Sequence, residues 1–115
     1  MKYDLDKIRW QVLRDMGWTT THPDTEVWIA PEGYVDPVSK GRLPDPAREA
    51  VDMLTVMEAH GIVLSPIFGE GGWCASDEFA DNPRPQVVND VAQIAVCLLA
   101  LDKAGHNIED FEVTP

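Results

Sequence analysis

Five side chains of the kinds that bind transition metals or act as nucleophiles are the first candidates for chemistry. They are His22, His60, Cys74, Cys97 and His106. A zinc site takes its ligands in closely spaced pairs, because a short loop must close around the ion. None of the five residues forms such a pair, so the sequence predicts no metal site and no bound cofactor.

A cysteine nucleophile is the second candidate. Cys74 follows a glycine-rich turn and Trp73, an order that could present a thiol to a substrate. A reactive thiolate needs positive charge nearby. The closest charged residues in the sequence are instead acidic: Glu70, Asp77 and Glu78. Negative neighbours raise the pKa of a thiol, so we expect Cys74 to be an unreactive residue of a strand.

Neither a phosphate loop nor an acid–base pair is indicated. The glycine-rich segment 69–72 lacks the lysine of a phosphate-binding loop and leads into a strand rather than a helix. Acid–base catalysis needs a carboxyl group whose pKa is shifted by burial, and the paired acids of this chain lie in polar surroundings. The sequence therefore predicts an interaction protein rather than an enzyme.

The charge distribution is the most specific signal. The 115 residues include 20 acidic and nine basic ones, and the net charge is −11. Nucleic acids and anionic membranes need a basic surface, so neither is expected as a direct partner. Between Arg48 and Arg84 there is no Lys or Arg, but this stretch holds Glu49, Asp52, Glu58, Glu70, Asp77, Glu78 and Asp81.

Two amphipathic patterns predict the first two helices. The first runs from Leu5 to Met16, with Asp4 or Asp6 as its cap and Gly17 as its stop. The second begins at Asp45-Pro46 and ends at His60-Gly61. The apolar stripe expected on this second helix consists of Ala47, Ala50, Val51, Leu54 and Met57.

A third pattern, from Arg84 or Pro85 to Ala104 with Gly105 as its stop, is apolar around most of its girth. A helix of this kind is buried, so we expect it at the centre of the core. The tail His106–Pro115 is acidic and is expected to be mobile unless its apolar residues dock it. Those residues are Ile108, Phe111 and Val113.

Short β-rich runs lie between the helices. Glu26–Ala30 predicts a strand, which Tyr34-Val35 could pair with, and the flanking segments Thr19–Asp24 and Asp36–Leu43 are expected to be loops. Ile62–Phe68 and Trp73–Ser76 predict a hairpin. Pro66 indicates a bent, bulged or edge strand, and the acidic segment Asp77–Pro85 predicts a solvated loop. The expected fold is a single α+β domain over residues 1–115, a three-layer sandwich of three helices on a small antiparallel sheet.

Several of these pieces together resemble a known family. They are Leu43-Pro44-Asp45 before a helix, the hydrophobic hairpin around Gly69 to Trp73, and the Ala/Leu-rich last helix. In the first half, Met16-Gly17-Trp18 and Trp28 before Pro31 also fit. The chain resembles the phage ABA-sandwich domain family, small proteins of bacteriophages and prophages, over nearly its whole length. Its segment from Asp36 to Gly41 and its tail depart from that pattern. The resemblance implies a phage origin and a helix–sheet–helix sandwich, but no catalytic residues, because the family has no assigned activity.

The cellular compartment can be predicted from the cysteine content and from the length of the apolar runs. Cys97 falls in an apolar helical pattern, which predicts a buried free thiol, as is usual in a reducing cytoplasm; a disulfide to Cys74 stays open as an alternative. Met1–Asp6 lacks the apolar segment of a signal peptide. The longest apolar run, Ile94–Leu101, is far shorter than the roughly 20 residues that span a bilayer. With the phage resemblance, the expected location is the host cytoplasm.

Charge and resemblance together predict a partner with a basic surface. Such surfaces occur on host defence complexes that bind nucleic acid, CRISPR effectors among them. Carboxylates of another protein can occupy the positions where phosphates would bind. The predicted contact comprises the acidic residues Glu70, Asp77, Glu78 and Asp81, with Trp73 and Phe79 as apolar anchors. A second acidic patch is Glu109, Asp110 and Glu112.

Three alternatives stay open at this point. The acidic loop could serve only solubility. The chain could be an accessory or minor structural phage protein. It could also bind a small ligand, or act on one, in a pocket near His60, Trp73 and Cys74.

Overall fold

The computed structural model describes residues 2–20, 27–29, 38–39, 43–78 and 86–113. Its elements in chain order are α1 (Leu5–Asp15), β1 (Thr19–Thr20), β2 (Val27–Ile29), β3 (Val38–Ser39), α2 (Ala50–His60), β4 (Ile62–Pro66), β5 (Trp73–Asp77), β6 (Gln86–Asn89), α3 (Ala92–Lys103) and the 3-10 turn η2 (Ile108–Phe111). Strands β4, β5 and β6 form an antiparallel sheet in that order, and β1, β2 and β3 form a second, smaller one.

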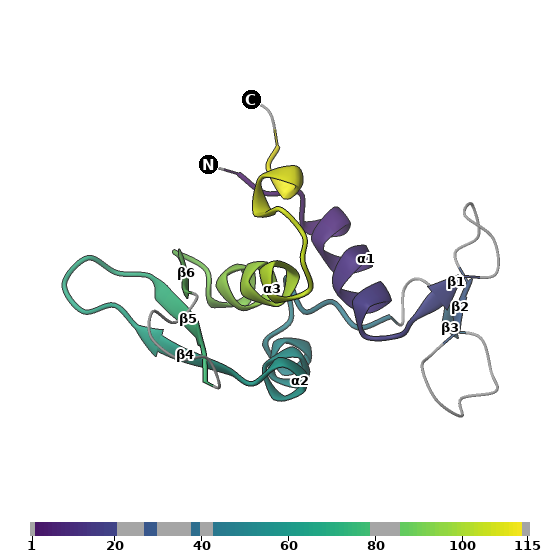
Figure 1. Cartoon of the computed structure of the whole chain (residues 1–115), viewed down its shortest axis with the longest axis horizontal. Helices are drawn as coiled ribbons and strands as arrows, with labels where there is room; N and C mark the ends of the chain where they lie inside the picture. The colour runs from purple at the N-terminus through teal and green to yellow at the C-terminus, as the bar shows by residue number, and fades with distance from the viewer. Residues whose placement is uncertain (1, 21–26, 30–37, 40–42, 79–85, 114–115) are drawn as a thin grey trace.

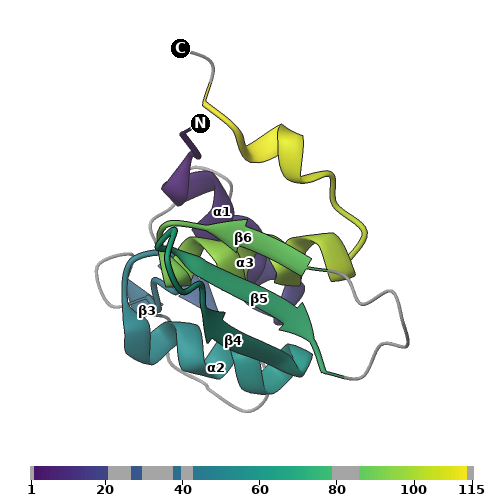
Figure 2. The same cartoon turned by 90° about the vertical axis from the view of Figure 1, so that its left-hand side faces the viewer.

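Helix α3 is the centre of the molecule. It packs against all three strands of the β4–β6 sheet on one side and against α1 and α2 on the others. The sheet lies in front of the helices when the molecule is turned by 90°, so that one sheet face is turned away from them (Figure 2). The predicted α+β fold, three helices on a small antiparallel sheet, is confirmed, and the sheet on which they pack has three strands.

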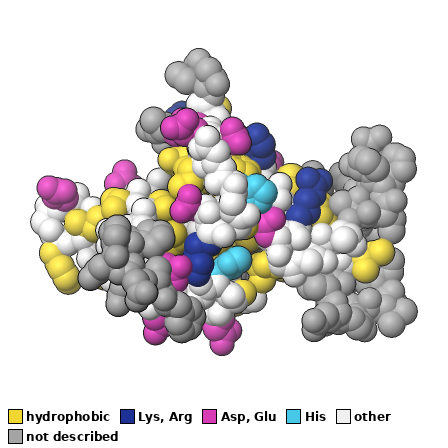
Figure 3. All heavy atoms as spheres, viewed as in Figure 1, with side chains coloured by type: hydrophobic (Ala, Val, Ile, Leu, Met, Phe, Trp, Pro, Cys, Tyr) yellow, Lys and Arg dark blue, Asp and Glu magenta, His cyan; other side chains and the backbone are white. Residues whose placement is uncertain are grey.

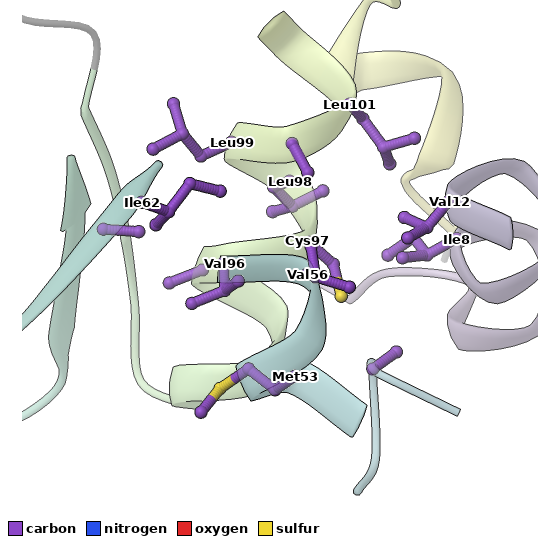
Figure 4. Packing of buried hydrophobic residues seen from close by; sticks show 14 of the residues in the cluster. Ile8, Val12, Met53, Val56, Ile62, Val96, Cys97, Leu98, Leu99 and Leu101 are labelled. Atoms are coloured by element: carbon purple, nitrogen blue, oxygen red, sulfur yellow. The ribbon is translucent and has the colours of Figure 1, made fainter. Parts of the chain in front are cut away.

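The core is built around seven consecutive buried residues of α3, from Ala95 to Leu101. Buried side chains from α1, α2 and β4 pack against them: Ile8, Val12, Met53, Val56 and Ile62 (Figure 4). A helix buried around its whole girth needs apolar neighbours on every side. This confirms the prediction that the third helix is the most buried element.

Helix α1 begins and ends where the sequence predicts. The Asp4 side chain accepts a hydrogen bond from the backbone N–H of Lys7 (3.1 Å) and so caps the first turn. Gly17 has a φ of 102°, and the N–H of Trp18 donates to the carbonyl of Leu13 (2.9 Å). This is the Schellman arrangement, which satisfies carbonyls that the helix end would leave without a partner.

The small sheet corrects two loop predictions. Thr19–Thr20 and Val38–Ser39, both expected in loops, pair with the two sides of β2. Strands of two residues are too short to show alternation in a sequence. The expected strand Glu26–Ala30 is confirmed in its described part, Val27–Ile29, whereas Tyr34-Val35 lies outside the described residues.

Helix α2 begins later than predicted and buries a different face. The segment from Asp45 is a turn, in which the carbonyl of Asp45 accepts from the N–H groups of Arg48 and Glu49, and the helix starts at Ala50. Its buried residues are Met53 and Val56, with Met57 half-buried. Of the predicted stripe, Ala50, Val51 and Leu54 are exposed. The helix is apolar on two faces, so spacing alone selected the wrong one.

The third predicted helix also begins later than expected. Gln86–Asn89, placed in the helix by its apolar spacing, is strand β6, and α3 starts only at Ala92. Val87 and Val88 pair with Ala75 and Cys74 of β5, in keeping with the preference of β-branched side chains for strands. The Asn89 side chain accepts from the N–H of Val91 (2.9 Å), which turns the chain into the helix.

The β4–β5 hairpin and the tail complete the fold. The hairpin pairs Ile62 with Asp77 at one end and Pro66 with Trp73 at the other, and Pro66 ends the edge strand β4, as predicted. Phe111 of η2 is buried, and residue 112 forms a β-bridge with Tyr3. Of the three apolar residues expected to dock the tail, Phe111 and Ile108 pack against the core, whereas Val113 is 45% exposed.

Candidate functional site

The predicted acidic contact does not form one cluster among the described residues. Glu70 lies in the turn between β4 and β5, whereas Asp77 and Glu78 lie at the other end of β5. The strand spans about 13 Å, because each of its steps rises roughly 3.3 Å. Asp81 and Phe79 lie outside the described residues.

Asp77 is a structural residue. It is 8% exposed, and its carboxylate forms an ion pair with the ammonium group of Lys103 (Oδ2 to Nζ, 3.1 Å). The same ammonium group donates to the backbone carbonyl of His60. These bonds tie the ends of β5, α3 and α2 together, so the charge of Asp77 is neutralised inside the protein.

Glu78, by contrast, is exposed beside the start of β4. Its backbone N–H donates to the carbonyl of Gly61 (2.8 Å). Gly61 has a φ of 64°, the left-handed conformation that lets α2 end and the chain turn directly into β4. The turn and this hydrogen bond place Glu78 next to the last turn of α2.

A groove opens at this junction. Its volume is about 580 Å³, and it is lined by Leu54, Met57, Glu58, Gly61, Ile62 and Glu78. Leu54 is 56% exposed, whereas Ile62 is buried beneath it. The described part of the lining joins three apolar side chains with two carboxylates and holds no basic residue.

The sequence interpretation missed the apolar half of this surface. Leu54 was assigned to the core, and the acidic residue one helical turn along, Glu58, was counted only as part of the charge distribution. Their spacing of four residues places them on one helix face. Nothing in the sequence shows that this face points outward, because α2 carries apolar residues on both of its faces.

Trp73 is half-buried rather than an exposed anchor. It pairs with Pro66 on one side and Asn89 on the other, in the row of β5 that also contains the buried Ala75. Phe68, in the adjoining turn, is 90% exposed and is the large apolar side chain that this end of the sheet presents.

The alternative pocket near His60, Trp73 and Cys74 is not formed by these residues. His60 ends α2 beside the Ile62–Asp77 end of the hairpin, whereas Trp73 lies at the opposite end. Neighbouring residues of a strand point to opposite sheet faces, so Cys74 faces away from Trp73. Burial lowers the pKa of His60, and the positive charge of Lys103 lowers it further, whereas Asp15 opposes this change.

Several basic side chains of the described residues have partners within the protein, either carboxylates or backbone carbonyls. Arg48 pairs with Asp6 (3.0 Å) and Asp45 (2.9 Å), and Lys103 pairs with Asp77. Arg9 donates to the carbonyls of Leu43 and Pro44, and Lys7 donates to the carbonyl of Asp110. Within the part of the chain that the structure describes, no ion pair or side-chain hydrogen bond involves the carboxylates of Glu58, Glu70 or Glu78.

The second predicted patch lies away from the groove. Glu109 and Asp110 are exposed on η2, and Glu112 lies beside Tyr3, where its charge adds to the effect of burial in raising the tyrosine pKa. The η2 turn and α2 lie at opposite ends of the molecule in both views (Figures 1 and 2). Acidic side chains are therefore distributed over the surface, with exposed apolar side chains between them (Figure 3).

No group of three His, Cys, Asp or Glu side chains among the described residues is arranged to hold a metal ion, and both cysteines are free thiols. No helix in the described ranges has the length and apolar character needed to cross a bilayer.

Comparison of the chain with protein-family models, with curated proteins and with solved structures found no match. The resemblance to the phage ABA-sandwich family therefore stays a prediction.

Proposed function

We propose that this chain is an acidic interaction protein that binds a partner with a basic surface. One observation carries the proposal: four of the described basic side chains are held by internal acceptors, whereas Glu58, Glu70 and Glu78 have no side-chain partner among the described residues. These three carboxylates are exposed and available to a partner. Uncompensated carboxylates attract and orient basic proteins.

The finer proposal is that the partner is a host protein whose own ligand is nucleic acid, such as a CRISPR effector or another defence complex. A surface that binds phosphates also accepts carboxylates, because both are anionic oxygen acceptors of Arg and Lys. The chain would then block access of nucleic acid to the partner. The phage origin implied by the resemblance and the net charge of −11 support this choice.

Affinity capture from host lysate, with mass spectrometry at low and moderate salt, tests the proposal. We expect basic nucleic-acid-binding proteins to be retained at low salt and released as the salt concentration rises. Added DNA should compete with the chain for the retained partner. The double variant Glu58→Lys/Glu78→Lys should no longer capture the partner. The double variant Glu109→Lys/Asp110→Lys, with the same change in net charge, should still capture it.

Two results would contradict the proposal: capture of no basic protein, or equal loss of capture in both double variants. Either would favour an accessory structural role. Detection of the chain in purified phage particles would then support that role.

A further inference from the structure

The groove between α2 and the start of β4 has features that the general acidity of the chain does not explain. Its volume of about 580 Å³ lies within the range of roughly 300–1,000 Å³ found for ligand sites. Its floor is apolar, formed by Leu54, Met57 and Ile62, and the carboxylates of Glu58 and Glu78 belong to the same lining. An acidic surface that serves only solubility has no need of an apolar floor.

The apolar surface continues along α2 beyond the groove. Val51 is 76% exposed and lies one helical turn before Leu54, which is 56% exposed. Residues three and four apart share a helix face, so Val51, Leu54 and Glu58 form one outward stripe. A stripe that leads into a groove suits a partner segment lying along the helix, as in helix-in-groove recognition.

The charge of the groove restricts its occupant. Among the described residues, no basic side chain lines the groove, and the carboxylates of Glu58 and Glu78 have no ion-pairing partner there. A second copy of this chain that docked symmetrically through the same groove would bring the same carboxylates against one another, and nucleic acid would bring phosphates. Like charges placed close together destabilise a contact. The occupant must therefore supply positive charge as well as an apolar side chain.

We infer that this groove binds an amphipathic, basic segment of a partner protein, with a large apolar side chain over Leu54, Met57 and Ile62 and with Lys or Arg beside Glu58 and Glu78. The inference rests on the proposed function and adds a location and a partner chemistry to it. Apolar contact supplies the affinity, and the two carboxylates fix the register of the basic residues.

A designed peptide tests the inference directly. It has about 15 residues, roughly four helical turns, with Leu at helical spacing on one face and Lys or Arg elsewhere. Two matched peptides separate the contributions: one replaces each Leu by Ser and keeps the charge, and the other replaces each Lys and Arg by Glu and keeps the Leu residues. We expect only the first peptide to bind, with NMR amide shifts confined to residues 51–62 and 78.

Variants of the chain locate the contact. Leu54→Gln should weaken binding about tenfold, because it removes an apolar anchor and keeps a long side chain with good helix propensity. Thr55→Gln is the matched control, since Thr55 is exposed on the same helix and does not line the groove. Equal melting temperatures of the variants would show that both are folded.

Three outcomes would overturn the inference: no binding of the amphipathic peptide, equal binding of the Ser-substituted peptide, or amide shifts outside the groove. These outcomes can be told apart from results that would contradict the proposed function. A captured cellular partner that is lost with Glu58→Lys/Glu78→Lys but kept with Leu54→Gln would retain the acidic contact and reject the groove.

Discussion

Two neighbouring acids, Asp77 and Glu78, show how far a residue's role depends on its partner. The sequence places both in one acidic loop, but Asp77 is the last residue of β5 and faces Lys103, whereas Glu78 is exposed. Successive residues of a strand point to opposite sides. Lys103 follows 26 positions later, and sequence spacing cannot reveal a pair that only the tertiary fold brings together.

The pair predicts a stability difference between these two acids. Asp77→Asn should lower the free energy of unfolding by about 1–2 kcal/mol, because Lys103 loses a charged, largely buried acceptor. Glu78→Gln, which removes the same charge at an exposed position, should change it by less than about 0.5 kcal/mol. Urea unfolding followed by circular dichroism measures both values. Equal effects would show that the ion pair does not contribute to stability.

The two thiols should differ in reactivity. Burial raises the pKa of Cys97 to about 12, and this side chain has no exposed surface. Cys74 is partly exposed on the sheet face turned away from the helices. A thiolate-directed reagent should therefore modify Cys74 in the folded chain and Cys97 only after unfolding. Cys74→Ser should abolish modification of the folded chain, and modification that persists in this variant would contradict the burial of Cys97.

The environment of His60 predicts a specific pH dependence. Its lowered pKa means that the unfolded chain binds a proton at His60 more readily than the folded chain does. The stability that depends on neutral His60 is complete above the unfolded pKa of about 6.5 and declines as the pH falls toward the lower folded value. His60→Gln should therefore lose less melting temperature than the native chain between about pH 7.5 and pH 5. An equally steep loss in both proteins would be inconsistent with this cause.

At the scale of elements, the sequence predicted where the helices end better than where the second and third begin or which face of α2 is buried. Local signals were sufficient at Asp4, Gly17, Gly61 and Gly105, since caps and stops depend on neighbouring residues only. The outward face of α2 was assigned to the core because Val51 and Leu54 satisfy the same spacing as Met53 and Val56. The choice between two apolar faces is made by the packing of α2 on α3, which no local pattern contains.

Strand β6 was missed for a related reason. Val87 and Val88 fit both a helical stripe and a β-rich run, and the sequence interpretation extended the strong pattern of α3 backwards. Pairing with β5 decides for the strand, since it satisfies backbone groups that would otherwise be left at the sheet edge. Asn89, whose side chain caps the turn that follows, is the signal that could have separated the two elements.

The position of α3 predicts the largest effect of a single substitution. Leu98 has no exposed surface, so Leu98→Ala should lower the free energy of unfolding by about 2–5 kcal/mol. Leu98→Asp should prevent folding, because an unpaired carboxylate would be buried in the core. Leu54→Ala, at an exposed position of α2, should lower the free energy of unfolding by far less than Leu98→Ala does. A cooperatively melting Leu98→Asp variant would contradict the central place of this helix.

At the scale of the whole molecule, charge and shape carry different information. The net charge of −11 and the stretch without Lys or Arg were readable from the sequence and pointed to a basic partner. The surface on which these charges could contact a partner could not be read from the sequence. Glu70 and Glu78 lie at opposite ends of β5, and Asp77 is neutralised. The groove of Leu54 and Glu58 exists only once α2 and β4 meet at Gly61.

The central place of α3 also bears on the order in which the protein is made. The ribosome completes α1, α2 and the β4–β5 hairpin before it reaches Ala92, and the side chains that these elements bury have α3 as their main partner. The backbone N–H of Asp4 forms its hydrogen bond still later, because its acceptor, the carbonyl of Phe111, is synthesised after α3. Contacts between residues so distant in sequence form late in folding. The core therefore closes only after nearly all of the described chain has been synthesised.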